Sequence, residues 1–281
     1  MKALKTPLRY PGGKSRACVK LEQYLPDLKR YREFREPFIG GGSVALHITK
    51  KYPDISIWVN DLYEPLINFW KELQYNGERL QLELLGLKSR HTTPTDARAL
   101  FDQCKDQLSL PLDKSLPFWR AVSFYVVNKC SFSGLTESSS FSKQASESNF
   151  SIRGIEKLVE YSKLIENWKI TNKSYQDLLT DWPGAFIYLD PPYDIKDNLY
   201  GKKGGMHKKF DHDKFAGDCD HCAAHQLISY NSSQLVKNRF KEWNVAEFSH
   251  TYTMRSVGHY MSDQQERKEL VLFNYGVESN E

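Results

Sequence analysis

Apolar positions along this chain follow two different periods, which predict strands and helices in turn. Residues 36–61 contain an apolar segment, a glycine turn, a stretch with helix-compatible spacing and an alternating segment at 55–59. Residues 185–189 form a continuous apolar run that ends at two prolines, as expected for a buried parallel strand. Further strands are predicted at 227–230 and 270–273. This order predicts an α/β fold, with a parallel sheet and helices on its faces.

The middle of the chain has a different pattern. Residues 71–125 are predicted to be largely helical, whereas residues 128–151 are rich in Ser, Asn and Gly and are predicted to form a long loop. Loops of that length are usually functional or disordered. We therefore predict one domain from residues 1–70 and 171–281, and an inserted, mainly helical domain from residues 71–170.

Composition narrows the class of protein without identifying it. The chain has 281 residues, of which 40% are hydrophobic and 26% charged, which suits a core domain with a smaller lobe. The net charge of +4 is too small to indicate nucleic-acid binding unless charge is clustered locally. The five cysteines are scattered, the first residues lack the apolar run of a signal peptide, and no stretch is long and apolar enough to span a membrane. We expect a cytoplasmic protein with reduced thiols.

The glycine turn is the first candidate binding site. Gly40, Gly41 and Gly42 follow a predicted strand and precede a helix, so the backbone can approach a ligand at the positive end of that helix. Asp61 ends the next strand, where an acidic side chain can hydrogen-bond ribose hydroxyls. The spacing is neither G-x-G-x-x-G nor a P-loop, which favours a nucleoside without a pyrophosphate. A purely structural turn would explain the glycines alone equally well.

The second candidate is the turn at Asp190, Pro191, Pro192 and Tyr193, which follows the apolar run at 185–189. Open α/β sheets bind their ligands at the carboxyl ends of strands. A carboxylate and a proline carbonyl together can accept both N–H groups of a planar amino group, and a tyrosine ring can stack on a base. Methylation of such an amino group fits this chemistry. The alternative is a rigid turn after a strand.

Four motifs in this order resemble the Dam-type (D12 class, α group) adenine-N6 DNA methyltransferases; they lie at residues 10–14, 36–44, 60–61 and 190–193. The resemblance covers nearly the whole chain. It implies a Rossmann-like S-adenosylmethionine-dependent methyltransferase sheet, with the inserted helical domain as the target-recognition domain. It also implies transfer of a methyl group from S-adenosylmethionine to adenine N6 in double-stranded DNA, after the base has been flipped out of the duplex.

The resemblance assigns roles by position. The cofactor would be bound by Tyr10, Lys14, Pro37, Phe38, Gly40, Asp61, Asp177 and Asp190. The catalytic residues would be Asp190, Pro191, Pro192 and Tyr193. Tyr10 stands where the family often has Trp, Asp61 would hold the ribose, and Asp177 resembles a contact near the adenine of the cofactor.

The resemblance also implies a DNA-contacting hairpin at residues 128–135, in which Phe132 stands at the position of an intercalating Tyr. A core phenylalanine is the alternative. The DNA-contacting residues would be Lys129, Phe132, Ser133, Lys202, Lys203 and Arg255. For Lys202 and Lys203, a solvated surface loop is nearly as good an explanation. Residues 136–149 depart from the pattern that reads GATC, so GATC is expected only as the family's usual site.

Several alternatives stay open at this point. At the position of Asp190, enzymes that methylate cytosine N4 more often have Ser, and enzymes that methylate protein glutamine usually have Asn. Asp190 therefore favours adenine as the target. A non-catalytic DNA-binding relative would have lost its cofactor motifs, which are present here. Cys219 and Cys222 have no second cysteine pair, so no metal site is predicted. We expect the protein to be a monomer. It would function either alongside a restriction endonuclease or as a solitary enzyme.

Overall fold

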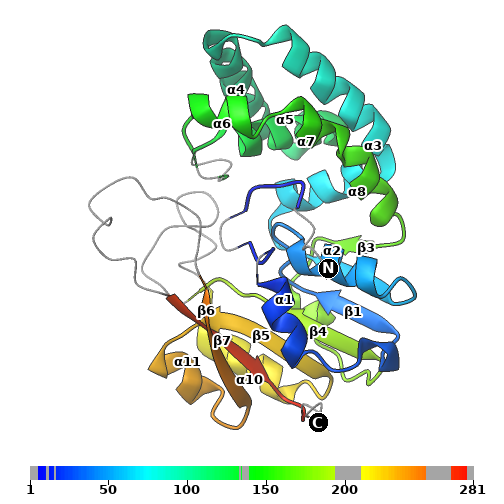
Figure 1. Ribbon diagram of the computed structural model, residues 1–281, viewed down its shortest axis with the longest axis vertical. Helices are drawn as coiled ribbons and strands as arrows, with labels where there is room; N and C mark the ends of the chain where they lie inside the picture. Colours follow the sequence, from blue (N-terminus) through cyan, green and yellow to red (C-terminus); the bar gives the residue numbers. More distant parts are fainter. Residues whose placement is uncertain are drawn as a thin grey trace.

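The computed structural model describes residues 6–10, 13–15, 17–132, 134, 139–193, 210–250 and 267–276 (Figure 1). These residues form a seven-stranded sheet in the order β3-β2-β1-β4-β5-β7-β6. β1 to β5 are parallel, and β7 runs antiparallel to both β5 and β6. The strands are β1 (Glu33–Glu36), β2 (Ser56–Asn60), β3 (Lys169–Thr171), β4 (Ala185–Leu189), β5 (His225–Asn231), β6 (Asn244–His250) and β7 (Arg267–Phe273).

Both faces of the sheet are covered, as the continuous apolar run of β4 predicts. Phe186 and Tyr188 belong to one buried core, and Ile187 and Leu189 belong to the other. The first core includes residues of α1 (Cys18–Leu21) and α2 (Ser43–Lys51). The second includes residues of α10 (His212–His221) and α11 (Gln234–Arg239). The predicted α/β architecture with a mainly parallel sheet is therefore confirmed.

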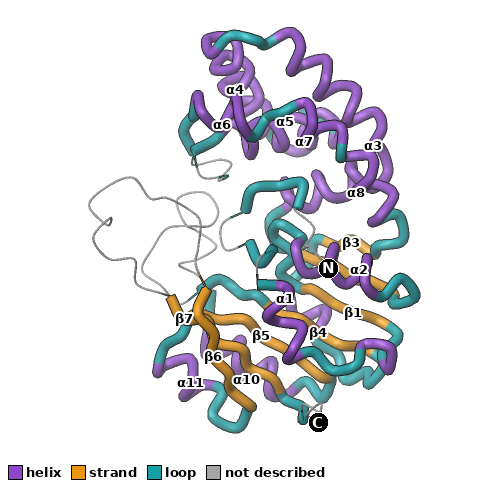
Figure 2. Tube along the Cα trace, viewed as in Figure 1, coloured by secondary structure: helices purple, strands orange, loops and turns teal. Residues whose placement is uncertain are grey.

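The remaining α-helices of the described residues lie between β2 and β3 in the chain and gather at one end of the molecule (Figure 2). They are α3 (Glu64–Arg90), α4 (Pro94–Ser109), α5 (Pro117–Cys130), α6 (Lys143–Ser148), α7 (Ile152–Glu156) and α8 (Leu158–Leu164). Short 3-10 turns complete the described structure at η1 (Glu22–Tyr24), η2 (Leu28–Arg30), η3 (Leu112–Lys114) and η4 (Tyr175–Leu178). None of the helices in the described part of the chain is long and apolar enough to cross a membrane.

Three details differ from the sequence prediction. β1 ends at Glu36 instead of continuing through Ile39, because a proline at 37 has no N–H to donate to the sheet. β3 and β6 were not predicted. The loop predicted at 128–151 contains α6, which begins where the Ser142 hydroxyl accepts a hydrogen bond from the Ala145 N–H. A serine-rich stretch thus includes a helix cap that composition alone hides.

α3 and α8 pack closely against each other in the helical region. Gly77 is buried in α3, and a Cβ atom there would lie 2.3 Å from the Cβ of Ser162. Gly86 lies in the same helix, where a Cβ would meet only the end of the flexible Arg90 side chain at 3.3 Å.

We therefore expect opposite effects on stability from two alanine substitutions in α3. Gly77→Ala should lower the free energy of unfolding by about 1–3 kcal/mol, because the helices are forced apart. Gly86→Ala should raise it by about 0.4–1 kcal/mol, because alanine favours the helix. Urea denaturation followed by circular dichroism measures both values. Equal effects of the two substitutions would contradict the close contact.

Candidate active site

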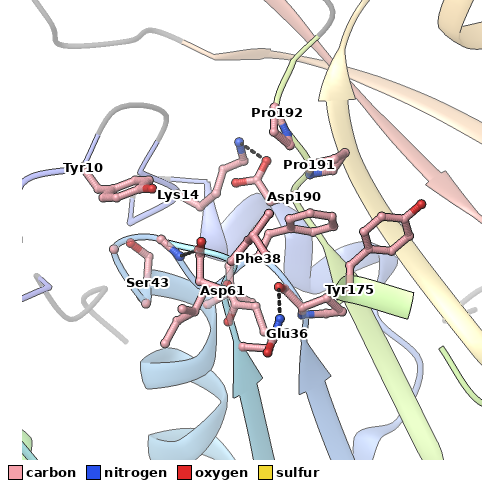
Figure 3. Close-up of a pocket in the computed structure, with 18 of the residues that line it drawn as sticks. Tyr10, Lys14, Glu36, Phe38, Ser43, Asp61, Tyr175, Asp190, Pro191 and Pro192 are labelled. Atoms are coloured by element: carbon pink, nitrogen blue, oxygen red, sulfur yellow. Dashed lines mark hydrogen bonds and ion pairs between the residues drawn. The ribbon is translucent and has the colours of Figure 1, made fainter. Parts of the chain in front are cut away.

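A pocket opens at the carboxyl ends of β1, β2 and β4 (Figure 3). The chain builds the sheet outward from β1 in one direction and from β4 in the other, and such a reversal of strand order is where open α/β sheets bind ligands. The pocket encloses about 1020 Å³, counted out to its open mouth.

The glycine turn forms one wall of this pocket. Gly40 and Gly42 have positive φ angles, of 46° and 70°, which favour glycine. A Cβ on Gly40 would lie 2.8 Å from the ring of Tyr10, and one on Gly42 would lie 2.7 Å from the ring of Trp70. The turn therefore has both the backbone conformation and the close packing that only glycine satisfies.

Two buried carboxyl groups support this wall. Asp61 accepts hydrogen bonds from the backbone N–H groups of Gly40, at 3.1 Å, and Tyr63, at 3.0 Å. Burial raises the pKa of Asp61 to about 6, although these backbone bonds oppose the rise. Glu36 accepts a hydrogen bond of 2.8 Å from the Ala45 N–H, and burial raises its pKa well above the usual range. Asp61 thus links the end of β2 to the glycine turn.

Lys14 is the centre of the polar side of the pocket. Its ammonium lies 3.0 Å from Oδ1 of Asp190 and 2.7 Å from Oε1 of Glu269, and it donates a 2.5 Å hydrogen bond to the Tyr193 hydroxyl. The Tyr193 hydroxyl in turn donates to Glu269. Burial raises the pKa of Asp190 to about 6; Lys14 opposes the rise and Glu269 adds to it. Asp190 is therefore mainly ionised at neutral pH.

Aromatic side chains form the opposite wall. Phe38 stacks on Tyr175 with 5.5 Å between ring centroids, and Phe210 lies edge-on to Phe38 at 5.9 Å. The Tyr175 hydroxyl donates a 2.6 Å hydrogen bond to Asp218, which fixes the orientation of that ring. A flat ligand can lie against this wall while the polar groups face it from the other side.

Most of the predicted cofactor and catalytic residues line this one pocket: Tyr10, Lys14, Pro37, Phe38, Gly40, Asp61, Asp190, Pro191 and Pro192. Tyr193 joins them through its contacts with Lys14. Asp177 lies at an exposed position of η4, outside the lining, whereas its neighbour Tyr175 is part of the wall.

The predicted DNA-contacting residues are less uniform. Phe132 is 49% exposed, so within this structure it is not a core residue. Lys129 is buried in α5 with its ammonium 5.3 Å from the centre of the Tyr125 ring, and burial lowers its pKa to about 8. Ser133, Lys202, Lys203 and Arg255 lie outside the described residues.

Glu269 is the main residue of the site that the sequence prediction missed. Its only mark in the sequence is a charged residue directly before the apolar run 270–273. Cys219 and Cys222 are buried free cysteines, and the Cys222 thiol donates to the Thr180 carbonyl at 3.5 Å. Within the described ranges, no three His, Cys, Asp or Glu side chains are grouped so that they could hold a metal ion.

The strand order and the pocket at its reversal fit the Rossmann-like methyltransferase fold. Over residues 10–254 the chain matches the family described as D12 class N6 adenine-specific DNA methyltransferase, and it belongs to that family. It is 24% identical over 281 residues to Type II methyltransferase M1.LlaDCHI of Lactococcus lactis subsp. cremoris, covering 95% of this chain and 94% of that protein. It is 26% identical over 197 residues to Type II methyltransferase M.MjaIII of Methanocaldococcus jannaschii, covering 66% and 68%.

The ion pair between Lys14 and Asp190 leads to a titration experiment. In a Lys14→Met variant, the pKa of Asp190 should rise above its wild-type value of about 6, because no ammonium stabilises the carboxylate. Carboxyl ¹³C chemical shifts followed against pH report this pKa directly. Lys51→Met, which removes the Glu22 ion pair outside the pocket, is the matched control and should leave it unchanged. An unchanged pKa of Asp190 in both variants would contradict the ion pair.

Proposed function

We propose that this adenine-specific DNA methyltransferase takes its methyl group from S-adenosylmethionine and transfers it to an adenine that has been flipped out of duplex DNA into the pocket. One observation carries the proposal. The glycine turn with Asp61 and the turn that begins at Asp190 line the same pocket, although they are far apart in the sequence. This arrangement supports a cofactor site next to an amino-group site, as methyl transfer requires.

The lining residues fit the cofactor. The Asp61 carboxylate suits ribose hydroxyls, and the wall of Phe38 and Tyr175 suits the face of an adenine ring. Lys14 and Asp190 supply charges of both signs, which suits a ligand that carries a carboxylate and cationic groups. The cofactor supplies an electrophilic methyl group on a sulfonium.

The catalytic turn acts on the amino group of the target. The lone pair of an exocyclic amino nitrogen is delocalised into the ring, so the nitrogen is a weak nucleophile. The Asp190 carboxylate and the Pro191 carbonyl accept hydrogen bonds from its two N–H groups and so localise the lone pair on nitrogen. Two consecutive prolines stiffen the turn that holds these acceptors. The Tyr193 ring offers a face for the base.

The helical region α3–α8 is our candidate for the target-recognition domain. Phe132 follows α5, and two backbone carbonyls of its loop bind one guanidinium: Arg9 donates to Ser131 at 2.6 Å and to Phe132 at 3.1 Å. The Asn128 side chain accepts from the Arg9 N–H at 2.9 Å and donates to the Arg9 carbonyl at 2.7 Å. Because Arg9 precedes the pocket residue Tyr10, the loop is tied to the active site. An exposed ring on an anchored loop suits a wedge that enters DNA.

Other parts of the proposal rest on the family and its relatives. GATC remains our first candidate for the recognised sequence. Both relatives are named type II methyltransferases, which supports pairing with a restriction endonuclease. We further propose that the protein acts as a monomer, and that residues 71–170 form the domain that reads DNA.

The reaction is tested by incubating the enzyme with duplex DNA and cofactor carrying tritium in its methyl group, and then separating the nucleosides. The wild-type protein should label N6-methyladenine. Asp190→Ala should reduce the rate at least about a hundredfold, because the amino group loses its charged acceptor. Asp113→Ala, at an exposed position of η3, is the matched control. Label in N4-methylcytosine, or a wild-type rate for Asp190→Ala, would overturn the proposal.

The wedge is tested with Phe132→Ala. Its rate of methylation of fully paired DNA should fall by about tenfold or more. Without the Phe132 ring, no side chain fills the gap that the flipped adenine leaves in the base stack, so flipping costs more free energy. A mismatch opposite the target adenine should restore most of that rate, since the base is then already unpaired. Tyr75→Ala, which removes another exposed ring from α3, should change neither rate. If Phe132→Ala methylates paired DNA at the wild-type rate, Phe132 is not a wedge.

A further inference from the structure

Glu269 is a charged side chain where the fold alone would favour an apolar one. It lies in β7, is 1% exposed, and is followed by the buried residues Leu270 to Phe273. A buried ion pair is weak evidence of a stabilising role, because removing two charges from water offsets much of their attraction. The role of Glu269 is therefore better inferred from where its partners lie than from the presence of an ion pair.

Two partners of Glu269, Lys14 and Tyr193, belong to the active site. Oε1 of Glu269 lies 2.7 Å from the ammonium of Lys14 and accepts a hydrogen bond from the Tyr193 hydroxyl. Lys14 also contacts Asp190 at 3.0 Å. The Tyr193 ring stacks on Tyr230 of β5 with 6.0 Å between centroids and 22° between planes. The Glu269 carboxylate thus contacts both the Lys14 ammonium, which pairs with Asp190, and the hydroxyl of Tyr193.

We propose that Glu269 is a positioning residue for methyl transfer: its carboxylate holds Lys14 against Asp190 and fixes the Tyr193 ring in the orientation in which it receives the target base. This inference rests on the proposed function of the same pocket. Glu269 acts through Lys14 and Tyr193, without contact to the reacting atoms. Sheet pairing supports this role, because Glu269 is in register with Asn231 of β5, next to the pairing of Leu270 with Tyr230.

Charge gives the inference a distinctive consequence. The cluster combines two carboxylates, the half-buried Asp190 and the buried Glu269, with the buried ammonium of Lys14. Glu269 raises the pKa of Asp190, so removal of its charge should lower that pKa. The titratable groups that act on Asp190 from the elements around it are Lys14, Glu269, Tyr193, Glu36 and Tyr188. Of these, Glu269 and Lys14 form an ion pair with each other, and substitution of Glu269 by Gln removes it.

The experiment compares Glu269→Gln and Glu269→Asp with the wild-type enzyme. Gln keeps an acceptor for Tyr193 without the charge, and Asp keeps the charge on a shorter side chain. For Glu269→Gln, kcat should fall about tenfold while KM for DNA and cofactor change less than about threefold. The acidic limb of its kcat–pH profile should move to lower pH, whereas that of Glu269→Asp should stay at the wild-type position with a reduced kcat.

Two readouts separate positioning from general damage. Calorimetric binding of S-adenosylhomocysteine and the melting temperature should both stay close to wild type in Glu269→Gln. Glu22→Gln, which removes a carboxylate paired with His47 and Lys51 outside the pocket, is the control and should leave kcat and the pH limb unchanged.

A wild-type kcat for Glu269→Gln would overturn the inference. So would an unmoved pH limb with a parallel loss of S-adenosylhomocysteine binding and melting temperature, which indicates a structural role. If Glu269→Gln does not fold, Glu269→Asp decides: a reduced kcat at an unchanged melting temperature supports positioning, and a wild-type kcat refutes it. Rates are scored on whichever nucleoside the wild-type enzyme labels, so a different target base would overturn the proposed function and leave this test valid.

Discussion

A buried ammonium must have carboxylate partners, and this requirement at Lys14 determines how the site is assembled. Lys14 is 3% exposed and lies between Asp190 at the end of β4 and Glu269 in β7. An unpaired charge at this depth would be strongly destabilising, so three distant segments of the chain must meet at one point. Burial raises the pKa of Asp190, and the same contacts modify that rise and hold the hydroxyl of Tyr193.

The sheet brings these groups together because parallel strands end at the same edge. The glycine turn follows β1, Asp61 follows β2 and Asp190 follows β4, so all three side chains or backbones face one pocket. Asp61 fastens the turn through the Gly40 N–H. The residues just before Tyr10 extend this assembly to the helical region, where Arg9 and Asn128 exchange backbone and side-chain hydrogen bonds. The pocket and the loop of Phe132 are thus parts of one connected structure.

The site residues that could be predicted from the sequence are those marked by the pattern of their own neighbouring residues. The glycine turn, Asp61 and the turn at Asp190 each stand at the end of a strand that its own apolar pattern reveals, and all of them line the pocket. Glu269 could not be found in this way, because its contacts depend on the pairing of β7 with β5 and on the path of the N-terminal segment.

A sequence motif does not show which of its side chains are buried, because burial depends on how the helices pack. Lys129 and Phe132 are three residues apart in one predicted motif, yet Lys129 is buried in the helical region and Phe132 is exposed. The first lies within α5 and packs near the Tyr125 ring, while the second follows the end of that helix. Asp177 shows the same effect, since η4 directs Tyr175 to the pocket and leaves Asp177 at an exposed position.

In the proposed reaction, Asp190 receives the amino group of a flipped adenine in this pocket. A crystal structure with duplex DNA and a non-reactive cofactor analogue tests it most directly. We expect an extrahelical adenine whose N6 lies within hydrogen-bond distance of the Asp190 carboxylate and the Pro191 carbonyl, with its ring against Tyr193. An adenine still stacked in the duplex, or one bound with N6 away from Asp190, would contradict it.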